Sequence, residues 1–174
     1  MKKIAVIAAT GKAGSLIAQK ALSHGHEVTA IVRNKERLKN QVTAVLEKDI
    51  FALTAEDLSG FDAIVLAHRA PAGQEEDYSK VAEKMIKILD GSESRLIIVG
   101  GASSLYLDEN RDQRLLDVTQ TDLPYYPTLL EMAKASLIYE SSKLNFTFFS
   151  PAEFFDPEGL ETNDYTITGD VLGY

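Results

Sequence analysis

The sequence contains no cysteine and no long apolar run. The first absence excludes disulfides, a thiolate nucleophile and a sulfur-ligated zinc site, and we expect no metal centre and a reducing, cytoplasmic environment. Because no apolar stretch approaches the length of a membrane span, we also expect no membrane attachment. The formal net charge of −8 argues against a nucleic-acid partner. The composition leaves the oligomeric state open.

The chain of 174 residues is 45% apolar and 25% charged, as is ordinary for a globular protein. It contains no internal repeat, linker or low-complexity tract. These features predict one domain that spans residues 1–174.

The start of the chain has the pattern of a strand, a glycine turn and a helix. Residues 4–9 are apolar without alternation, which is typical of a parallel strand covered on both faces. From Ala13 onward apolar residues recur at helical spacing until His24 and Gly25, and a second apolar run covers residues 28–32. The three segments together have the length of one βαβ unit.

The turn of this unit is predicted to bind a pyrophosphate. Gly11 permits a tight bend and a close approach of the backbone, and Gly14 lets the helix pack against the strand, with free N–H groups at the helix start facing the phosphate. Ala8 stands where the usual glycine trio has its first glycine. The predicted cofactor contacts of the turn are Ala8, Thr10, Gly11, Lys12 and Ala13.

Further apolar runs predict the rest of a sheet. We expect strands at 42–46, 61–67, 96–99 and 145–149, a capped turn at 54–58, and helices around 81–89 and 128–142, the second begun by a capping box of Thr128 and Glu131. The polar segment 106–127 is predicted to be a loop. The alternation predicts an α/β fold, a Rossmann-like three-layer doubly wound parallel sheet with strand order 3-2-1-4-5-6.

Four segments carry a resemblance to a known family: residues 9–14, 26–34, 100–106 and 150–155. They resemble the atypical short-chain dehydrogenase/reductases, in particular the NmrA-like and NADH-flavin reductase groups of NAD(P)-binding proteins. The resemblance covers nearly the whole chain, and similar proteins usually continue with another strand and helix, so we expect a truncated form. It implies that Asp49 and Ile50 border the adenine ring, although by spacing alone Asp49 is equally well explained as a solvated loop carboxylate. It also implies that Asn34, Gly101 and Pro151 contribute to the cofactor site.

Two strand ends add candidates for the cofactor site. Ala67 and His68 follow the fourth predicted strand, and open α/β sheets bind ligands at such ends. For His68 we favour a structural or pocket-lining role over catalysis, and its neighbours lack metal-ligand spacing. Arg33 ends the second strand, where NAD-selective proteins usually carry Asp or Glu. A guanidinium suits a 2′-phosphate, so we expect NADP(H) to be preferred over NAD(H), a solvated surface charge being the alternative.

The catalytic tyrosine and lysine of short-chain dehydrogenases have no clear counterpart. Tyr139 and Lys143 have the Tyr-x-x-x-Lys spacing, but the helical phase places Tyr139 opposite Leu130 and Leu137, which we interpret as the inward face. We therefore interpret the match as coincidental. In the better positional match Leu130 replaces the tyrosine and Lys134 is the lysine, either holding a ribose hydroxyl or solvated.

A hydroxyl for polarising a substrate carbonyl is available in Ser103 or Ser104, and of these Ser103 is our candidate, with Lys134, for catalysis. Phe154 and Phe155 are candidates for a substrate pocket wall or for core packing, and a short strand is predicted at 165–168.

The function that these observations predict is an NAD(P)H-dependent oxidoreductase that reduces a flavin, a quinone or a similar small acceptor. Hydride transfer is the chemistry of the nicotinamide itself, and such acceptors demand little acid catalysis. The missing tyrosine keeps a second reading open, a non-catalytic NAD(P)-binding redox sensor of the NmrA type. A sugar-nucleotide epimerase or dehydratase is the third alternative, which normally needs that tyrosine.

Overall fold

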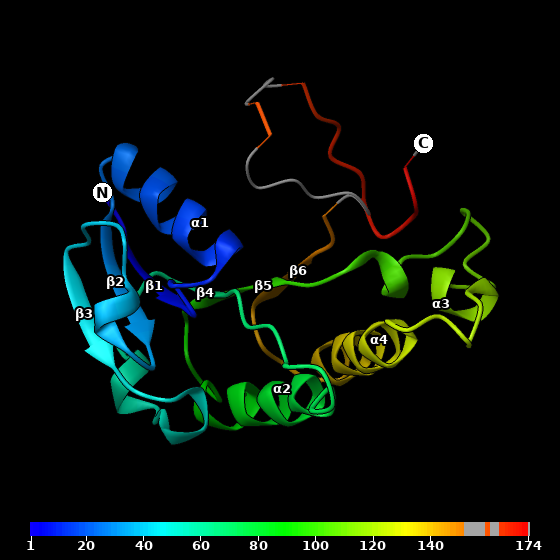
Figure 1. Cartoon of the computed structure of the whole chain (residues 1–174), viewed down its shortest axis with the longest axis horizontal. Helices are drawn as coiled ribbons and strands as arrows, with labels where there is room; N and C mark the ends of the chain where they lie inside the picture. Colours follow the sequence, from blue (N-terminus) through cyan, green and yellow to red (C-terminus); the bar gives the residue numbers. More distant parts are fainter. Residues whose placement is uncertain (152–158, 161–163, 174) are drawn as a thin grey trace.

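The computed structural model of the chain describes residues 1–151, 159–160 and 164–173. Its centre is a six-stranded, all-parallel sheet with the order β3-β2-β1-β4-β5-β6 (Figure 1). The strands are β1 (Lys3–Ile7), β2 (Glu27–Val32), β3 (Ala44–Glu47), β4 (Ala63–Leu66), β5 (Arg95–Val99) and β6 (Phe146–Phe149). The predicted Rossmann-like fold and strand order are confirmed.

Helices cover both faces of the sheet. In Figure 1 the helix α1 (Lys12–Ser23) lies on one side of the sheet, and α2 (Asp77–Ile88) and α4 (Tyr126–Glu140) lie together on the other. The segment after β5 contains the short helix α3 (Leu115–Val118). Four short 3-10 helices complete the elements: η1 (Lys35–Arg37), η2 (Ile50–Ala52), η3 (Glu56–Leu58) and η4 (Ala102–Ser104). None of the helices in the described ranges is long and apolar enough to cross a membrane.

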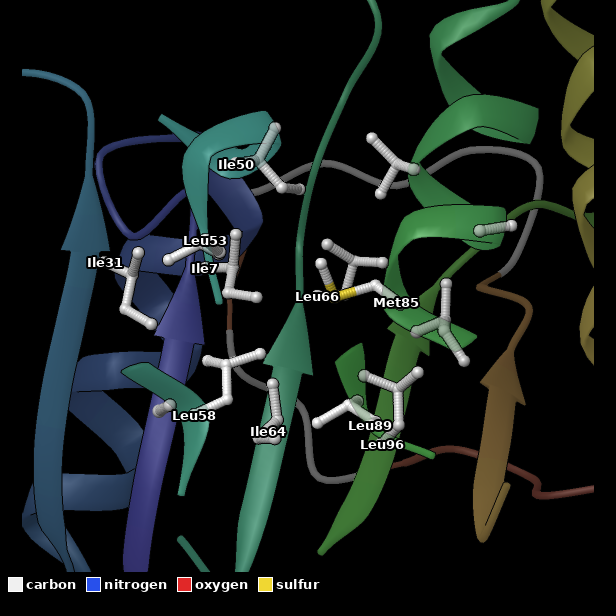
Figure 2. Close-up of a cluster of buried hydrophobic side chains, with 14 of the residues drawn as sticks. Ile7, Ile31, Ile50, Leu53, Leu58, Ile64, Leu66, Met85, Leu89 and Leu96 are labelled. Atoms are coloured by element: carbon white, nitrogen blue, oxygen red, sulfur yellow. The ribbon is translucent and has the colours of Figure 1, made fainter. Parts of the chain in front are cut away.

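Each face of the sheet has its own core. On one face Ile7 and Ile64 of the strands belong to the same buried cluster as Met85 of α2 (Figure 2). On the opposite face Val6 and Val28 are buried in a cluster with Ala18 of α1. Neighbouring residues of one strand thus enter opposite cores, which is why the sequence shows continuous apolar runs.

Two element boundaries differ from the prediction. β1 ends at Ile7 rather than at residue 9, because Ala8 has a φ of 62° and leaves the strand. α4 begins at Tyr126 with Pro127 in its first turn, a position where the missing N–H of proline costs nothing. The predicted capping box is therefore wrong, and Glu131 instead accepts hydrogen bonds from Ser79 and Lys134.

The phase predicted for α4 is also wrong. Tyr139 is only 1% exposed, whereas Leu137 is 51% exposed. The tyrosine ring packs against Phe146 and Phe148, with ring centroids 5.8 and 6.5 Å away. The face of α4 that carries Tyr139 therefore packs against the sheet.

The last part of the described chain returns to the segment after β5. Residues 165–168 do not form the predicted strand; instead Val171 makes a parallel bridge with Tyr106. Phe154 and Phe155 lie outside the described residues. The predicted turn at 54–58 is confirmed, with Thr54 and Asp57 bonded to each other in both directions.

Candidate cofactor-binding site

A cleft of about 270 Å³, open to solvent, lies along the carboxyl ends of the strands. We call it the edge cleft. Its walls come from the segments that directly follow β1, β2, β3 and β4. The lining residues are Ile7, Ala8, Thr10, Gly11, Ile31, Val32, Arg33, Arg37, Lys48, Asp49, Ile50, Phe51, Ala67, His68, Arg69, Pro71, Gln74 and Asp77.

The turn after β1 is built around Ala8. Its φ of 62° lies in the left-handed region, which residues other than glycine seldom adopt. The Ala8 N–H donates to the carbonyl of Ile31, and the Ala8 carbonyl accepts from the N–H of Gly11, both at 2.9 Å. Gly11 itself has a φ of −75°, so the sharp bend that we predicted at Gly11 is made by Ala8 instead.

Gly14 provides the contact between the helix and this turn. A Cβ at Gly14 would lie 2.4 Å from the Ala8 carbonyl oxygen, far inside van der Waals contact. At Gly11 the same distance would be 3.2 Å, which is tight but less severe. The predicted role of Gly14 in helix packing is thus seen directly, and the absence of its side chain lets α1 start against the bend.

The start of α1 offers uncapped N–H groups. Its N-cap is Gly11, no side chain caps it, and the first turn contains no acidic residue. The first N–H groups of a helix have no partner within the helix, and the helix dipole favours an anion in front of them. Because Thr10 and Gly11 line the edge cleft, the helix start faces a space in which a phosphate can bind.

The edge cleft is basic although the whole chain is acidic. Four basic and two acidic side chains line it, against a net charge of −8 for the protein. Lys48 is paired with Asp57 at 2.6 Å, and this hydrogen bond, with those from Thr54, lowers the pKa of Asp57 to about 2. In the described part of the chain, none of the ion pairs involves Arg33, Arg37 or Arg69. These guanidinium groups fit a ligand that carries several phosphates.

A second, smaller cavity adjoins the edge cleft beneath the sheet, and we call it the inner cavity. It lies between β4, β5 and the helices α2 and α4, and His68 lines both cavities. Its other lining residues are Leu66, Tyr78, Val81, Ile98, Val99, Gly100, Met132, Ala135, Tyr139 and Phe148. The His68 ring packs edge-on against Tyr78, with 6.0 Å between the centroids.

Most of the predicted cofactor residues meet in the edge cleft, and the others stand outside it. Those in the cleft are Ala8, Thr10, Gly11, Arg33, Asp49, Ile50, Ala67 and His68, and those outside its lining are Lys12, Ala13, Asn34, Gly101 and Pro151. The Asn34 side chain accepts from the N–H of Glu36 and caps a 3-10 helix. The Asp49 side chain similarly accepts from the N–H of Phe51.

The two catalytic candidates are engaged elsewhere and line neither cavity. Ser103 is buried, and its hydroxyl donates to the carbonyl of Leu129 at 3.0 Å. Lys134 is half exposed and bonded to Glu131 at 2.6 Å.

Sequence reasoning missed several residues of the cleft. Arg37 stands in the charged segment between β2 and β3, and Arg69, Gln74 and Asp77 follow the fourth strand. A usable signal was present, because ligands in such sheets bind beyond the carboxyl ends of strands. That rule identifies the loop after β4, but which of its side chains turn inward depends on the loop conformation.

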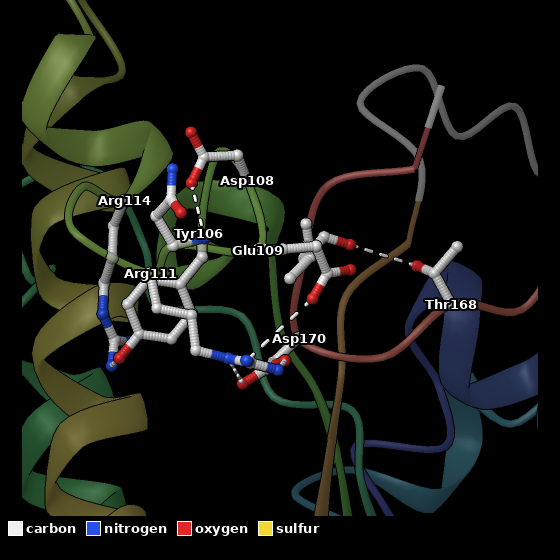
Figure 3. A network of polar contacts seen from close by, with 9 residues as sticks. Tyr106, Asp108, Glu109, Arg111, Arg114, Thr168 and Asp170 are labelled. Carbon is white, nitrogen blue, oxygen red and sulfur yellow. Dashed lines mark hydrogen bonds and ion pairs between the residues drawn. The ribbon is translucent and has the colours of Figure 1, made fainter.

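Hydrogen bonds and ion pairs join the loop after β5 to the last described residues of the chain (Figure 3). Arg111 pairs with Asp170 at 2.9 Å, and the N–H of Tyr106 donates to the Asp170 carbonyl. The Arg114 guanidinium lies 4.6 Å from the centre of the Tyr106 ring and also pairs with Glu140 of α4. These contacts connect residues 170–172 to the segment that follows Ser103, and that segment to α4.

Within the described residues no group of three or more His, Asp or Glu side chains is arranged to hold a metal ion.

The edge cleft combines an uncapped helix start, a backbone turn and guanidinium groups that form no ion pair with the described residues. These are the features by which a doubly wound sheet binds a dinucleotide.

Comparison with known proteins identifies the class. The sequence profile of an NAD(P)H-binding family matches residues 8–172, and the chain belongs to this family. The chain is 44% identical over 165 residues to YwnB of Bacillus subtilis, an uncharacterized protein, an alignment that covers 94% of this chain and 78% of YwnB.

Solved structures give the same class. A "putative NADH-flavin reductase" from Streptococcus pneumoniae superposes with a TM-score of 0.94 at 38% identity, covering 100% of this chain and 83% of that one. A "putative epimerase" from Bacteroides thetaiotaomicron superposes with a TM-score of 0.80 at 28% identity, covering 98% of this chain and 80% of that one.

Proposed function

We propose that the protein is an NAD(P)H-dependent oxidoreductase that reduces a flavin, a quinone or a similar small acceptor. The observation that carries the proposal is the edge cleft, in which an uncapped helix start and unpaired guanidinium groups meet at the carboxyl end of the sheet. The nicotinamide supplies the hydride when it is bound, and the protein supplies binding and orientation. The similarity to the streptococcal protein supports a flavin or related ring as the acceptor.

Each part of the cleft has a role in this proposal. The N–H groups at the start of α1, beside Thr10 and Gly11, bind the pyrophosphate. Asp49 and Ile50 border the adenine. The predicted contacts outside the cleft lining, Lys12, Ala13, Asn34, Gly101 and Pro151, stay candidates for a dinucleotide that extends past its rim.

The proposal includes a preference for NADP(H). Arg33 follows β2, where an acidic residue would otherwise accept hydrogen bonds from the ribose. The nearby carboxylate Glu47 accepts from the N–H of Lys35, which lowers its pKa, and it does not line the cleft. Arg37 stands in the same cleft. Two guanidinium groups that form no ion pair with any described residue suit the additional charge of a 2′-phosphate.

The proposed reaction requires little acid catalysis from the protein, and the site contains few groups that could donate a proton. By sequence position we match Leu130 to the usual catalytic tyrosine, and Tyr139 is buried in the core with a pKa raised by that burial. Ser103 and Lys134 stay weaker candidates, because each would have to exchange its hydrogen bond to Leu129 or Glu131 for one to a ligand.

A non-catalytic redox sensor is the second candidate, and the same lack of an acid favours it. An epimerase or dehydratase ranks below both, because such reactions use a tyrosine where this chain has Leu130. The similarity to the "putative epimerase" keeps it on the list.

Oxidation of NADPH and NADH with a panel of flavins and quinones tests the proposal. We expect acceptor-dependent turnover, with a lower KM for NADPH than for NADH. The control is Gly11→Val, which should turn over neither dinucleotide. Tight dinucleotide binding with no turnover on any acceptor would favour the sensor instead.

A further inference from the structure

Two polar atoms at the inner cavity have no hydrogen-bond partner among the described residues. They are the hydroxyl of Tyr139 and Nε2 of His68, and both are fully buried. Burial of an unpaired polar atom destabilises the folded state, and such atoms are uncommon in native proteins. Both side chains line the same cavity, one from α4 and the other from the end of β4.

The inner cavity has room for a water molecule. Its volume is about 20 Å³, above the ~10–15 Å³ that one water requires. A buried water also requires at least two polar partners. Among the side chains that line the cavity only His68, Tyr78 and Tyr139 are polar, and two of these carry the unpartnered atoms.

We propose that the inner cavity binds a water molecule that accepts a hydrogen bond from the Tyr139 hydroxyl and donates one to Nε2 of His68. The water satisfies both buried atoms and fixes the tautomer of His68. With Nε2 as acceptor, the neutral imidazole carries its proton on Nδ1. Tyr139 is then a positioning residue that acts on the edge cleft through His68.

The protonation states agree with this direction of hydrogen bonding. Burial lowers the pKa of His68, as does Arg33, while Asp77 and Asp49 oppose the shift, so the imidazole is neutral at neutral pH. Burial raises the pKa of Tyr139, so its phenol keeps the proton that it donates. The phenol therefore donates a hydrogen bond to the water, and the imidazole accepts one from it.

His68 connects the inner cavity to the edge cleft, because it lines both. Of its two ring nitrogens only Nε2 is both buried and unpartnered. In this tautomer Nδ1–H is the donor that we assign to an oxygen of a bound dinucleotide, and this last step rests on the proposed function. The water site itself does not depend on which ligand the edge cleft binds.

Nitrogen NMR of the ligand-free protein tests the water site. The chain has three histidines, and His24→Gln and His26→Gln assign the signals. We expect His68 as the neutral Nδ1–H tautomer. Tyr139→Phe should shift the His68 nitrogens toward a mixture of tautomers, whereas Tyr125→Phe, at an exposed tyrosine, should leave them unchanged. A neutral Nε2–H tautomer in the parent protein would overturn the proposal.

Three further measurements keep the result decisive. A high-resolution crystal structure should show water density in the inner cavity, and an empty cavity would overturn the proposal even if Tyr139→Phe does not fold. A Tyr139→Phe variant that melts higher than the parent would show a dry cavity, again against it. NADPH affinity should fall a few-fold in Tyr139→Phe, with turnover within a few-fold of the parent. A parent that binds no dinucleotide would contradict the proposed function but leave the tautomer result intact.

Discussion

Ala8→Gly is expected to stabilise the protein, although glycine usually destabilises a folded chain. Ala8 has a φ of 62°, at the bend between β1 and the start of α1. The left-handed region costs an L-residue about 1–2 kcal/mol, and glycine removes this cost. The variant also places at this position the glycine that most dinucleotide-binding turns carry.

The magnitude follows from two opposing terms. Relief of the left-handed conformation contributes ~1–2 kcal/mol, and the greater freedom of glycine in the unfolded chain subtracts ~0.4–1 kcal/mol. We expect a net gain of about 0.5–1 kcal/mol. For a chain of this size that gain raises the melting temperature by roughly 1–4 °C.

Two neighbouring substitutions provide matched controls. Gly14→Ala places a Cβ 2.4 Å from the Ala8 carbonyl oxygen, so the backbone must move, and we expect a loss of about 1–3 kcal/mol. Ala21→Gly makes the same chemical change as Ala8→Gly inside α1, and it should destabilise by at least ~0.5–1 kcal/mol. The three variants thus differ in sign for reasons that the local geometry gives.

Urea unfolding measures all three variants. The midpoint should rise for Ala8→Gly and fall for the two controls, with an unchanged dependence on denaturant. A loss of stability in Ala8→Gly comparable to that of Ala21→Gly would show that Ala8 is not strained. A Gly14→Ala variant as stable as the parent would refute the close approach of α1 to the turn.

Three other predictions concern the edge cleft and its support. Gly11→Val should abolish nucleotide binding in a calorimetric titration while the domain stays folded, and an unchanged affinity would contradict the pyrophosphate site. Arg33→Ala should erase most of the preference for NADP(H) by weakening the phosphorylated form; equal affinities of the parent for both dinucleotides at low salt would refute the role of Arg33. The pKa of Asp57 is lowered from 3.8 to about 2, so its pairing with Lys48 stabilises the fold above pH ~4 and is lost as the pH falls toward 2. Asp57→Asn should remove that part of the acid unfolding profile. Superimposable acid unfolding profiles of the variant and the parent would contradict this role of Asp57.

The sheet could be predicted from the sequence because its signals are local. Each strand that is covered on both faces must be apolar throughout, and the alternation of strands with helices limits the possible topologies. The edge cleft was partly predictable for the same reason, since Arg33, Asp49 and His68 each follow a strand.

Other features depend on contacts that are distant in sequence. The phase of α4 was misjudged because apolar side chains surround the helix, and only tertiary packing decides that Tyr139 is buried and Leu137 exposed. The bend at Ala8 was missed because alanine gives no signal for a positive φ. The pairing of Glu131 with Ser79 joins α4 to α2, which no local pattern encodes.

The strand order has a consequence for the growing chain on the ribosome. β1 is made first but lies in the middle of the sheet, paired with β2 on one side and β4 on the other. β2 follows soon after β1 and can cover one edge early, whereas the other edge stays open until β4 has emerged. During that interval an apolar strand exposes unpaired N–H and C=O groups, the condition that favours wrong pairing between chains. While residues 33–62 are being synthesised, β1 therefore has one edge that no strand of its own chain can yet cover.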